Sequence, residues 1–179
     1  MTLLLAGRFP SLFAGASAWV PISDLSAWYY ECQLSGRRYA QDLLKALGGP
    51  PHASENIRFD YRHRSPLTWL SRAASVPLDI NAGIRDGHEG SVPISHSFYA
   101  FNQLAAPDDR VSEFDILEFT GKSEVPAALV DHTLSDPSYG AKRPLFRRQS
   151  RNVRLTIFDG GHEGISSAGL NWLAKQTKP

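Results

Sequence analysis

Residues 153–162 read Val-Arg-Leu-Thr-Ile-Phe-Asp-Gly-Gly-His, an apolar run that ends in a glycine-rich turn carrying a histidine. Residues 76–86 repeat this order, because the apolar run 76–82 is followed by a turn that carries Asp86. A helix-like segment follows each turn. Parallel α/β folds place their reactive side chains at such turns, since the carboxyl ends of neighbouring strands meet at one edge of the sheet. The pattern therefore predicts that Asp86 and His162 lie at the same sheet edge.

A third apolar run, residues 12–20, contains small and apolar residues throughout, which is typical of a parallel strand buried on both faces. Helical spacing or helix-start residues mark further segments between the strands. They are 1–8, 36–47, a start at Ser65-Pro66, 92–104, 113–119 and 165–175. Residues 107–152 otherwise form a long mixed connection. Strands separated by helices predict an α/β fold with three parallel strands, in one domain over residues 1–179.

The composition is that of an ordinary globular protein. Of the 179 residues, 42% are hydrophobic and 21% are charged, and the net charge is +1. This charge balance does not suggest a nucleic-acid or membrane partner. The basic cluster 142–151 is interpreted as a solvated face, with a patch for acidic ligands as the alternative. No run approaches the ~20 apolar residues of a membrane span, and no signal peptide is recognised, so the compartment stays unassigned.

Four stretches carry a family resemblance. Residues 12–25 (LFAGASAWVPISDL) resemble the segment after the nucleophile helix of prolyl-oligopeptidase-like serine peptidases and esterases, which have the α/β-hydrolase fold. Residues 64–67 (RSPL) resemble the helix start before that family's acid strand. Residues 83–97, with Gly-Ile-Arg-Asp and Val-Pro-Ile-Ser, resemble its acid turn, and residues 158–162 (FDGGH) resemble its histidine loop.

The resemblance covers the C-terminal half of the family's catalytic domain, so it implies a partial α/β-hydrolase fold. It assigns Asp86 as the triad acid that orients the histidine, and His162 as the general base. The family's Gly-x-Ser-x-Gly nucleophile motif is missing, and the closest approach, residues 15–19, lies within the predicted strand. The family's serine would fall just before Met1, which predicts a fragment truncated at the nucleophile helix, without its oxyanion hole.

Other acidic and histidine side chains provide alternatives. Glu89 is the second candidate for the triad acid, whereas Asp79 lies in mid-strand and is a poor one. His88 is expected in a loop and His96 on a helix surface. A less favoured reading is a metal site formed by both Gly-His-Glu-Gly loops. Its ligands would be His88, Glu89, His162 and Glu163. We expect no metal and no cofactor.

The sequence-based expectation is therefore a fragment of a serine-type hydrolase acting on peptides or esters. Alone, it should be inactive, because the serine and the oxyanion donors are missing. One alternative is a non-catalytic module that binds a partner through the uncovered sheet edge. Another is a chain that complements a separate polypeptide supplying the serine. The strand 12–20 would expose this edge, so we also expect self-association.

Overall fold

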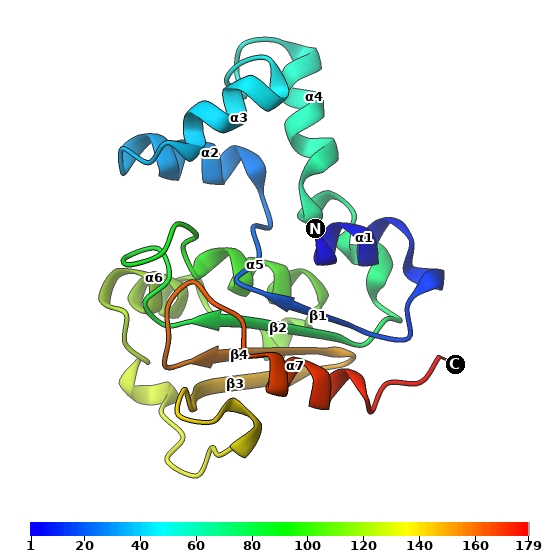
Figure 1. Ribbon diagram of the computed structural model, residues 1–179, viewed down its shortest axis with the longest axis vertical. Helices are drawn as coiled ribbons and strands as arrows, with labels where there is room; N and C mark the ends of the chain where they lie inside the picture. The colour runs from blue at the N-terminus through cyan, green and yellow to red at the C-terminus, as the bar shows by residue number, and fades with distance from the viewer. Residues whose placement is uncertain (179) are drawn as a thin grey trace.

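A computed structural model describes residues 1–178 and contains four strands and seven α-helices (Figure 1). The strands are β1 (Ala16–Trp19), β2 (Leu78–Gly83), β3 (Pro144–Ser150) and β4 (Val153–Phe158). The helices are α1 (Thr2–Arg8), α2 (Leu25–Leu34), α3 (Tyr39–Leu47), α4 (Glu55–Arg64), α5 (Ser95–Leu104), α6 (Glu113–Lys122) and α7 (Ser166–Leu173). Within this described part, no helix is both long and apolar enough to cross a membrane.

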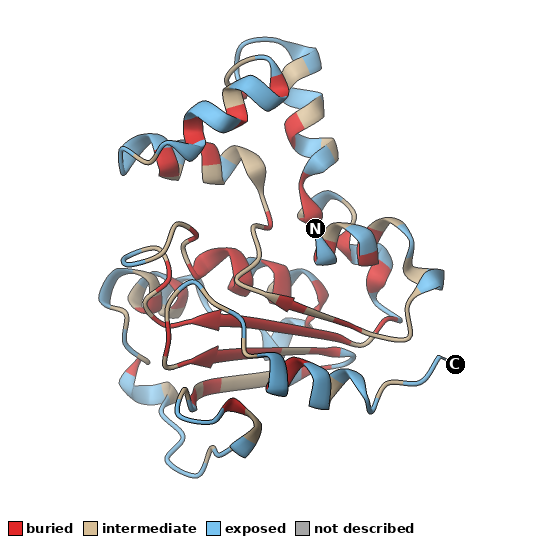
Figure 2. Ribbon diagram, in the orientation of Figure 1, coloured by how far each residue is buried: buried red, intermediate tan, exposed pale blue. Residues whose placement is uncertain are grey.

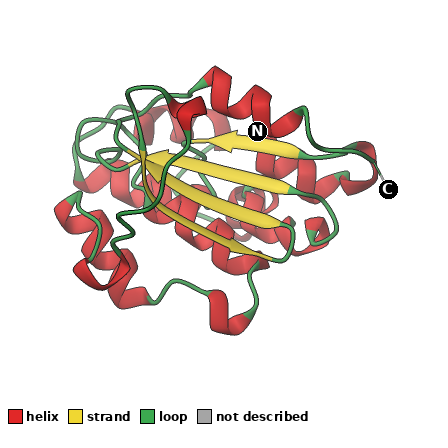
Figure 3. Cartoon of the chain, turned by 90° about the horizontal axis from the view of Figure 1, so that it is seen from below, coloured by secondary structure: helices red, strands yellow, loops and turns green. Residues whose placement is uncertain are grey.

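The four strands form one sheet in the order β1-β2-β4-β3 (Figure 3). β1, β2 and β4 run parallel, with Ala16 beside Leu78 and Leu78 beside Val153. β3 runs antiparallel to β4 and forms one edge of the sheet, whereas β1 forms the other. The three predicted strands are thus confirmed as parallel neighbours, although the sheet has a fourth strand that the sequence pattern did not predict.

β3 lies in the region expected to be a mixed connection. It contains Arg147, Arg148 and Gln149, so it lacks the apolar alternation that marks a half-buried strand. The turn into β4 is Arg151-Asn152, and Arg151 adopts a left-handed φ of 49°. This turn is unlike the Asn-Gly pair that marks most two-residue hairpins. Pairing with β4 therefore determines this strand more than its local sequence does.

The two faces of the sheet differ in chemistry. On one face, Leu78, Ile80 and Leu155 are fully buried in the main core, where α5 packs on β2 and β4 and α1 packs on β1. On the face beneath α7, the same strands present Asp79 and Arg154, which form an ion pair. Figure 2 shows β2 buried along its whole length, and Figure 1 shows α5 and α7 on opposite sides of the sheet.

Helices α2, α3 and α4 project from the sheet as a separate group (Figure 1). They surround a small core of their own, which consists of Tyr29, Cys32, Ala40, Leu43, Leu47 and Tyr61. The hydroxyl of Ser65 links the start of α2 to the end of α4, where the chain enters and leaves this group. It accepts the Leu25 N–H at 2.9 Å and donates to the carbonyl of Tyr61 at 2.7 Å.

Most predicted helices are present, and the exceptions lie in the projecting group. The segments predicted at 1–8, 36–47, 92–104 and 165–175 contain α1, α3, α5 and α7, and the segment predicted at 113–119 covers the first seven residues of α6. Gly48 ends α3 at a φ of 81°, a conformation that favours glycine. Ser65-Pro66 was expected to start a helix but begins only the 3₁₀ turn Pro66–Thr68. Helices α2 and α4, capped by Asp24 and Ser54, were not predicted.

Candidate active site at the carboxyl edge of the sheet

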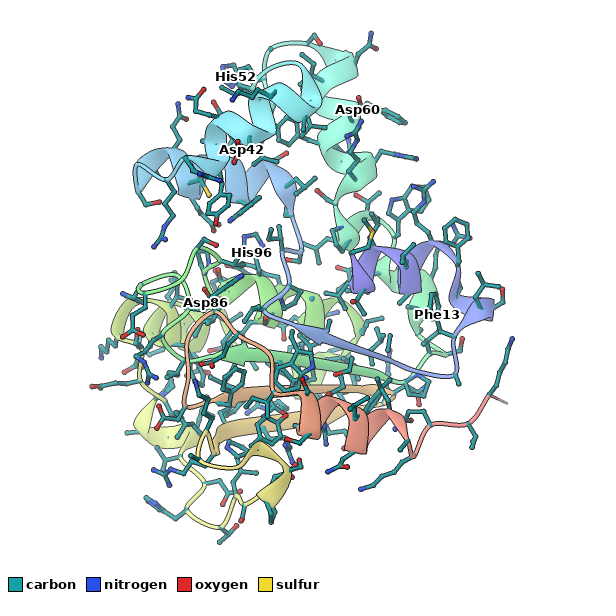
Figure 4. All side chains as sticks on the ribbon, viewed as in Figure 1. Phe13, Asp42, His52, Asp60, Asp86 and His96 are labelled. Atoms are coloured by element: carbon teal, nitrogen blue, oxygen red, sulfur yellow. The ribbon has the colours of Figure 1, made fainter. Side chains whose placement is uncertain are left out.

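Asp86 lies in the turn that follows β2, where its side chain is buried (Figure 4). Its Oδ1 atom accepts the backbone N–H groups of Gly87 at 2.9 Å and Val92 at 3.2 Å. Gly87 adopts a φ of 92°, so the turn uses the conformational freedom of glycine. These two bonds fix the carboxylate and leave its Oδ2 atom available to a second group.

His162 supplies that group from the loop that follows β4. Its Nδ1 atom lies 2.9 Å from Oδ2 of Asp86. An ionised carboxylate can only accept a hydrogen bond, so Nδ1–H is the donor and Nε2 of the neutral ring is left free to take a proton. The His162 side chain is 41% exposed, which makes this ring accessible. The predicted proximity of Asp86 and His162 is therefore confirmed, and we call them the Asp86–His162 pair.

Two glycines let the β2 and β4 loops approach closely enough for this contact. A Cβ atom on Gly83 would lie 2.3 Å from the carbonyl oxygen of Gly161. A Cβ on Gly90 would lie 2.1 Å from Oδ1 of Asp86 and 2.6 Å from Cβ of His162. Real side chains do not tolerate these distances. Gly83 at the end of β2 and Gly90 of the first Gly-His-Glu-Gly loop are therefore required for packing between the two loops.

Arg85 links the same two loops on their outer side. Its Nη1 atom lies 2.6 Å from Oδ1 of Asp159 and its Nε atom 3.2 Å from Oε2 of Glu89. Its backbone N–H also donates to the carbonyl of Gly160 at 3.0 Å. Because the side chains are partly exposed, we assign them a role in holding loop geometry and little net stability.

Burial raises the pKa of Asp86 above its ordinary value. The hydrogen bond and charge of His162, together with the N–H groups of Val92 and Gly87, oppose this rise without cancelling it. A buried carboxylate next to an imidazole stabilises that imidazole when it takes up a proton. The pair is therefore suited to general acid–base chemistry, with Nε2 of His162 as the exchanging atom.

A cavity of about 510 Å³ opens beside His162. Its walls are mostly apolar and aromatic and come from the end of β1, the acid loop, the start of α1 and the projecting helices. They include Trp19, Val20, Ile22, Leu25, Trp28, Tyr39, Pro66 and Val92. Val20 has a φ of 45°, a strained value for a β-branched residue, and such strain clusters at functional sites. The cavity can therefore hold an apolar group next to the histidine.

None of the hydroxyl groups in the described part is hydrogen bonded to Nε2 of His162. Thr2 and Ser91 line the cavity but have no such bond. Ser17, within the nearest approach to a nucleophile motif, donates to Asp79 at 2.9 Å and accepts the indole N–H of Trp19 at 3.0 Å. Ser17 is therefore committed to the polar network beneath α7 and is not poised for attack.

The two loops do not gather the proposed metal ligands. Within residues 1–178, no group of three His, Cys, Asp or Glu side chains could hold a metal ion. Glu89 pairs with Arg85, and Glu163 pairs with Lys142. Nε2 of His88 lies 2.6 Å from the carbonyl oxygen of Thr120 on α6. Glu89 thus points to an arginine, which leaves Asp86 as the acid that contacts His162.

His96 was expected on a helix surface, and this expectation is wrong. The side chain is 2% exposed and lies at the start of α5 (Figure 4). Nδ1 accepts the backbone N–H of Ser23 at 3.3 Å, and Nε2 lies 2.9 Å from Glu31. These two contacts join α5 to α2 and to the segment just before α2. The burial of His96 therefore depends on two helices whose association the local sequence does not reveal.

Sequence reasoning did not identify the cavity residues that come from the projecting helices. Trp28 of α2 lines the cavity and donates its indole N–H to the carbonyl of Ser91 at 3.0 Å. Arg37, just before α3, donates to the carbonyl of Gly87 at 3.0 Å. The aromatic run Trp28-Tyr29-Tyr30 was the available signal, because large aromatic residues near a predicted site often line it.

A comparison with protein-family models, curated proteins and solved structures found no match to this chain.

Proposed function

We propose that this chain carries the acid and the base of a serine-type hydrolase site of the prolyl-oligopeptidase type, within a partial α/β-hydrolase fold. One observation carries the proposal: Nδ1 of His162 lies 2.9 Å from the buried Asp86, at the carboxyl edge of adjacent parallel strands. In such a site the histidine accepts the proton of a nucleophilic serine and later protonates the leaving group. Asp86 holds the imidazole in the required tautomer and stabilises its charged form.

The substrate would be an ester or a peptide with an apolar group for the aromatic cavity. The serine must come from polypeptide other than these 179 residues, because they contain no Gly-x-Ser-x-Gly motif. Met1 and Thr2 border the cavity together with His162. A serine delivered beside Met1 and Thr2 would therefore enter the cavity that His162 lines.

The first test is the activity of the chain by itself. We expect no hydrolysis of p-nitrophenyl esters above the rate of His162→Ala, and no labelling by a fluorophosphonate, because no serine is activated. Turnover that disappears in His162→Ala, with a label on Ser17 or Ser91, would show that the chain has its own nucleophile and would contradict the proposed origin of the serine.

The second test is complementation. The coding DNA on the 5′ side of Met1 is searched for an in-frame Gly-x-Ser-x-Gly, and any such segment is expressed joined to this chain. We expect ester hydrolysis that is lost in Asp86→Asn and His162→Ala and kept in Glu89→Gln, because Glu89 pairs with Arg85. Activity of the joined chain that is indifferent to His162, or no activity in the joined chain, would overturn the proposal.

A binding module is the second candidate, and the open edge of β1 favours it. Within residues 1–178, β1 pairs only with β2, so the backbone groups on its other side are available to an added strand. Size-exclusion chromatography with light scattering separates the two readings. Self-association through this edge is expected for the hydrolase fragment, whereas a monodisperse and cooperatively unfolding monomer would favour the binding module.

A further inference from the structure

A second cavity lies on the α7 face of the sheet, away from the Asp86–His162 pair. It has a volume of about 390 Å³ and lies between α7, β4 and the 3₁₀ turn Pro137–Tyr139. Its lining mixes polar and apolar groups, and the polar side chains are Asp136, Ser138, Arg154, Asn171 and Lys175. Arg154 is four residues before Phe158, the last residue of β4, so it lies roughly 13 Å along the strand from its carboxyl end.

Arg154 is held in place from below by a buried carboxylate. Oδ1 of Asp79 accepts Nε of Arg154 at 2.8 Å, and Asp79 is fully buried. Its other oxygen accepts from Ser17 at 2.9 Å and from Asn81 at 2.8 Å. The guanidinium carbon also lies 5.8 Å from the ring centre of Trp172. These contacts immobilise the guanidinium before any ligand arrives.

The outer half of the same guanidinium remains available. Its Nη atoms have no hydrogen-bond partner among the described residues, and Arg154 lines the second cavity and also the neighbouring hollow beside Arg151. A buried ion pair is a weak source of stability, since apolar residues of similar volume serve as well or better. A rigid arginine with free donors facing a cavity is instead the arrangement that recognises oxyanions.

The charges around the cavity favour an anion. Asp136, the carboxylate in its wall, is already occupied by Arg147 at 2.9 Å and by the Ser138 hydroxyl at 2.6 Å. Burial acts to raise the pKa of Asp136, but these hydrogen bonds outweigh it and hold the pKa below its ordinary value. Lys175 has no carboxylate partner within residues 1–178. The charges of the Asp79–Arg154 and Asp136–Arg147 pairs cancel, so the cavity retains the positive charge of Lys175.

We propose that this cavity is a binding site for a small phosphate-bearing ligand, independent of the Asp86–His162 pair. The Nη atoms of Arg154 bind two phosphate oxygens, and Lys175, whose charge is left over from the internal pairs, binds a third. The side-chain amide of Asn171 contributes a further donor. Phosphate fits the site better than a carboxylate does, because its three terminal oxygens can contact Arg154, Lys175 and Asn171 at the same time, whereas a carboxylate offers two oxygens. The basic cluster noted in the sequence thus contributes Arg147 and Arg151 to the surroundings of a specific cavity.

The test is a titration of the ¹⁵N-labelled chain with inorganic phosphate, with chloride holding the ionic strength constant. We expect saturable shifts of the signals of Asn171, Trp172 and Lys175. Arg154→Lys keeps the charge and a donor for Asp79 but removes the fork, so the affinity should fall about tenfold. Lys175→Gln should weaken binding roughly threefold, and the matched surface variant Lys45→Gln on α3 should leave it unchanged.

Three results would overturn the proposal. The first is the absence of saturation at phosphate concentrations far above those in cells. The second is equal weakening by Lys45→Gln and Lys175→Gln, which would indicate general attraction to surface charge. The third is loss of binding in His162→Ala, which would place the phosphate at the other site. Retained binding in His162→Ala is the expected result, and it holds whether or not the proposed hydrolase function is correct.

Discussion

The two faces of the sheet use the same strands for different purposes. Beneath α5, Leu78, Ile80 and Leu155 are fully buried among apolar neighbours. Beneath α7, the alternate positions carry Asp79 and Arg154, which are joined by an ion pair of 2.8 Å. Apolar burial is non-directional and contributes about 25 cal/mol per Å². A buried polar network adds little net stability but fixes the position of each member.

This difference separates the part of the sheet that stabilises the fold from the part that positions side chains. The network on the α7 face reaches the candidate active-site cavity, because Ser17 bonds to Asp79 and accepts the indole N–H of Trp19, a cavity residue. At its other end the network holds Arg154 at the second cavity. One polar layer therefore contributes to both proposed sites, whereas the apolar face contributes only to the candidate active-site cavity, through Ala18.

Breaking the polar network should produce the largest effect. Asp79→Ala leaves the guanidinium of Arg154 without its buried partner, so we expect a loss of about 4 kcal/mol in the free energy of unfolding. The measurement is urea denaturation. The double variant Asp79→Leu/Arg154→Met should recover most of this loss, because it removes both charges. If the double variant is no more stable than the single one, the network contributes stability in its own right and the contrast between the faces fails.

The matched test on the apolar face is Leu155→Ala. Leu155 is fully buried, so the cavity left behind should cost about 3 kcal/mol. Leu170, on the outer side of α7, is 65% exposed, and Leu170→Ala should change the free energy of unfolding by less than about 0.5 kcal/mol. Similar small losses for both variants in urea denaturation would mean that the apolar face is not the main source of stability.

The sequence predicted the parts of this molecule that depend on local pattern. The strand at 153–158 matches β4 in both bounds, and the turns after two strands led to Asp86 and His162. Both sites, however, also contain residues that no local pattern marks. The sequence pattern marks Asp79 only as a poor candidate for the triad acid, and its role in holding Arg154 depends on a residue 75 positions away in the sequence.

The projecting helices show the same limit. Buried His96 and the cavity residue Trp28 acquire their roles only because α2 folds back on the acid loop and on the start of α5. The pairing of β3 with β4 is likewise a tertiary effect. Periodicity describes one segment at a time, so it cannot show where segments that are distant in the sequence come together.

The close approach of the loop after β2 to the loop after β4 can be tested with Gly83→Ala. The added Cβ would lie 2.3 Å from the Gly161 oxygen, so the loops must separate. We expect a loss of about 2 kcal/mol in the free energy of unfolding, in the range of overpacking substitutions. The downfield Nδ1–H signal of His162 should also weaken.

Gly121→Ala on α6 is the control, because nothing lies within 4 Å of its added Cβ and alanine favours a helix by up to about 1 kcal/mol. An unchanged His162 signal in Gly83→Ala would show that the pair does not need this packing.

The smallest expected effect is the pH dependence that Asp86 contributes to stability. Because burial raises its pKa, the folded protein holds a proton on Asp86 at pH values where the unfolded chain has lost it. Stability from this group is therefore present at low pH and is lost as the pH rises through the folded pKa. The free energy of unfolding of the wild type minus that of Asp86→Asn should fall between about pH 4 and that raised pKa, by about 1.4 kcal/mol for each tenfold difference in proton affinity.

Asp131→Asn provides a control of opposite sign, because hydrogen bonds from Thr133 lower the pKa of Asp131 and its contribution should disappear as the pH falls. If the wild-type difference instead rises with pH, the ionised form of Asp86 is the one that the fold stabilises, and the bond to His162 would then outweigh the burial of the carboxylate.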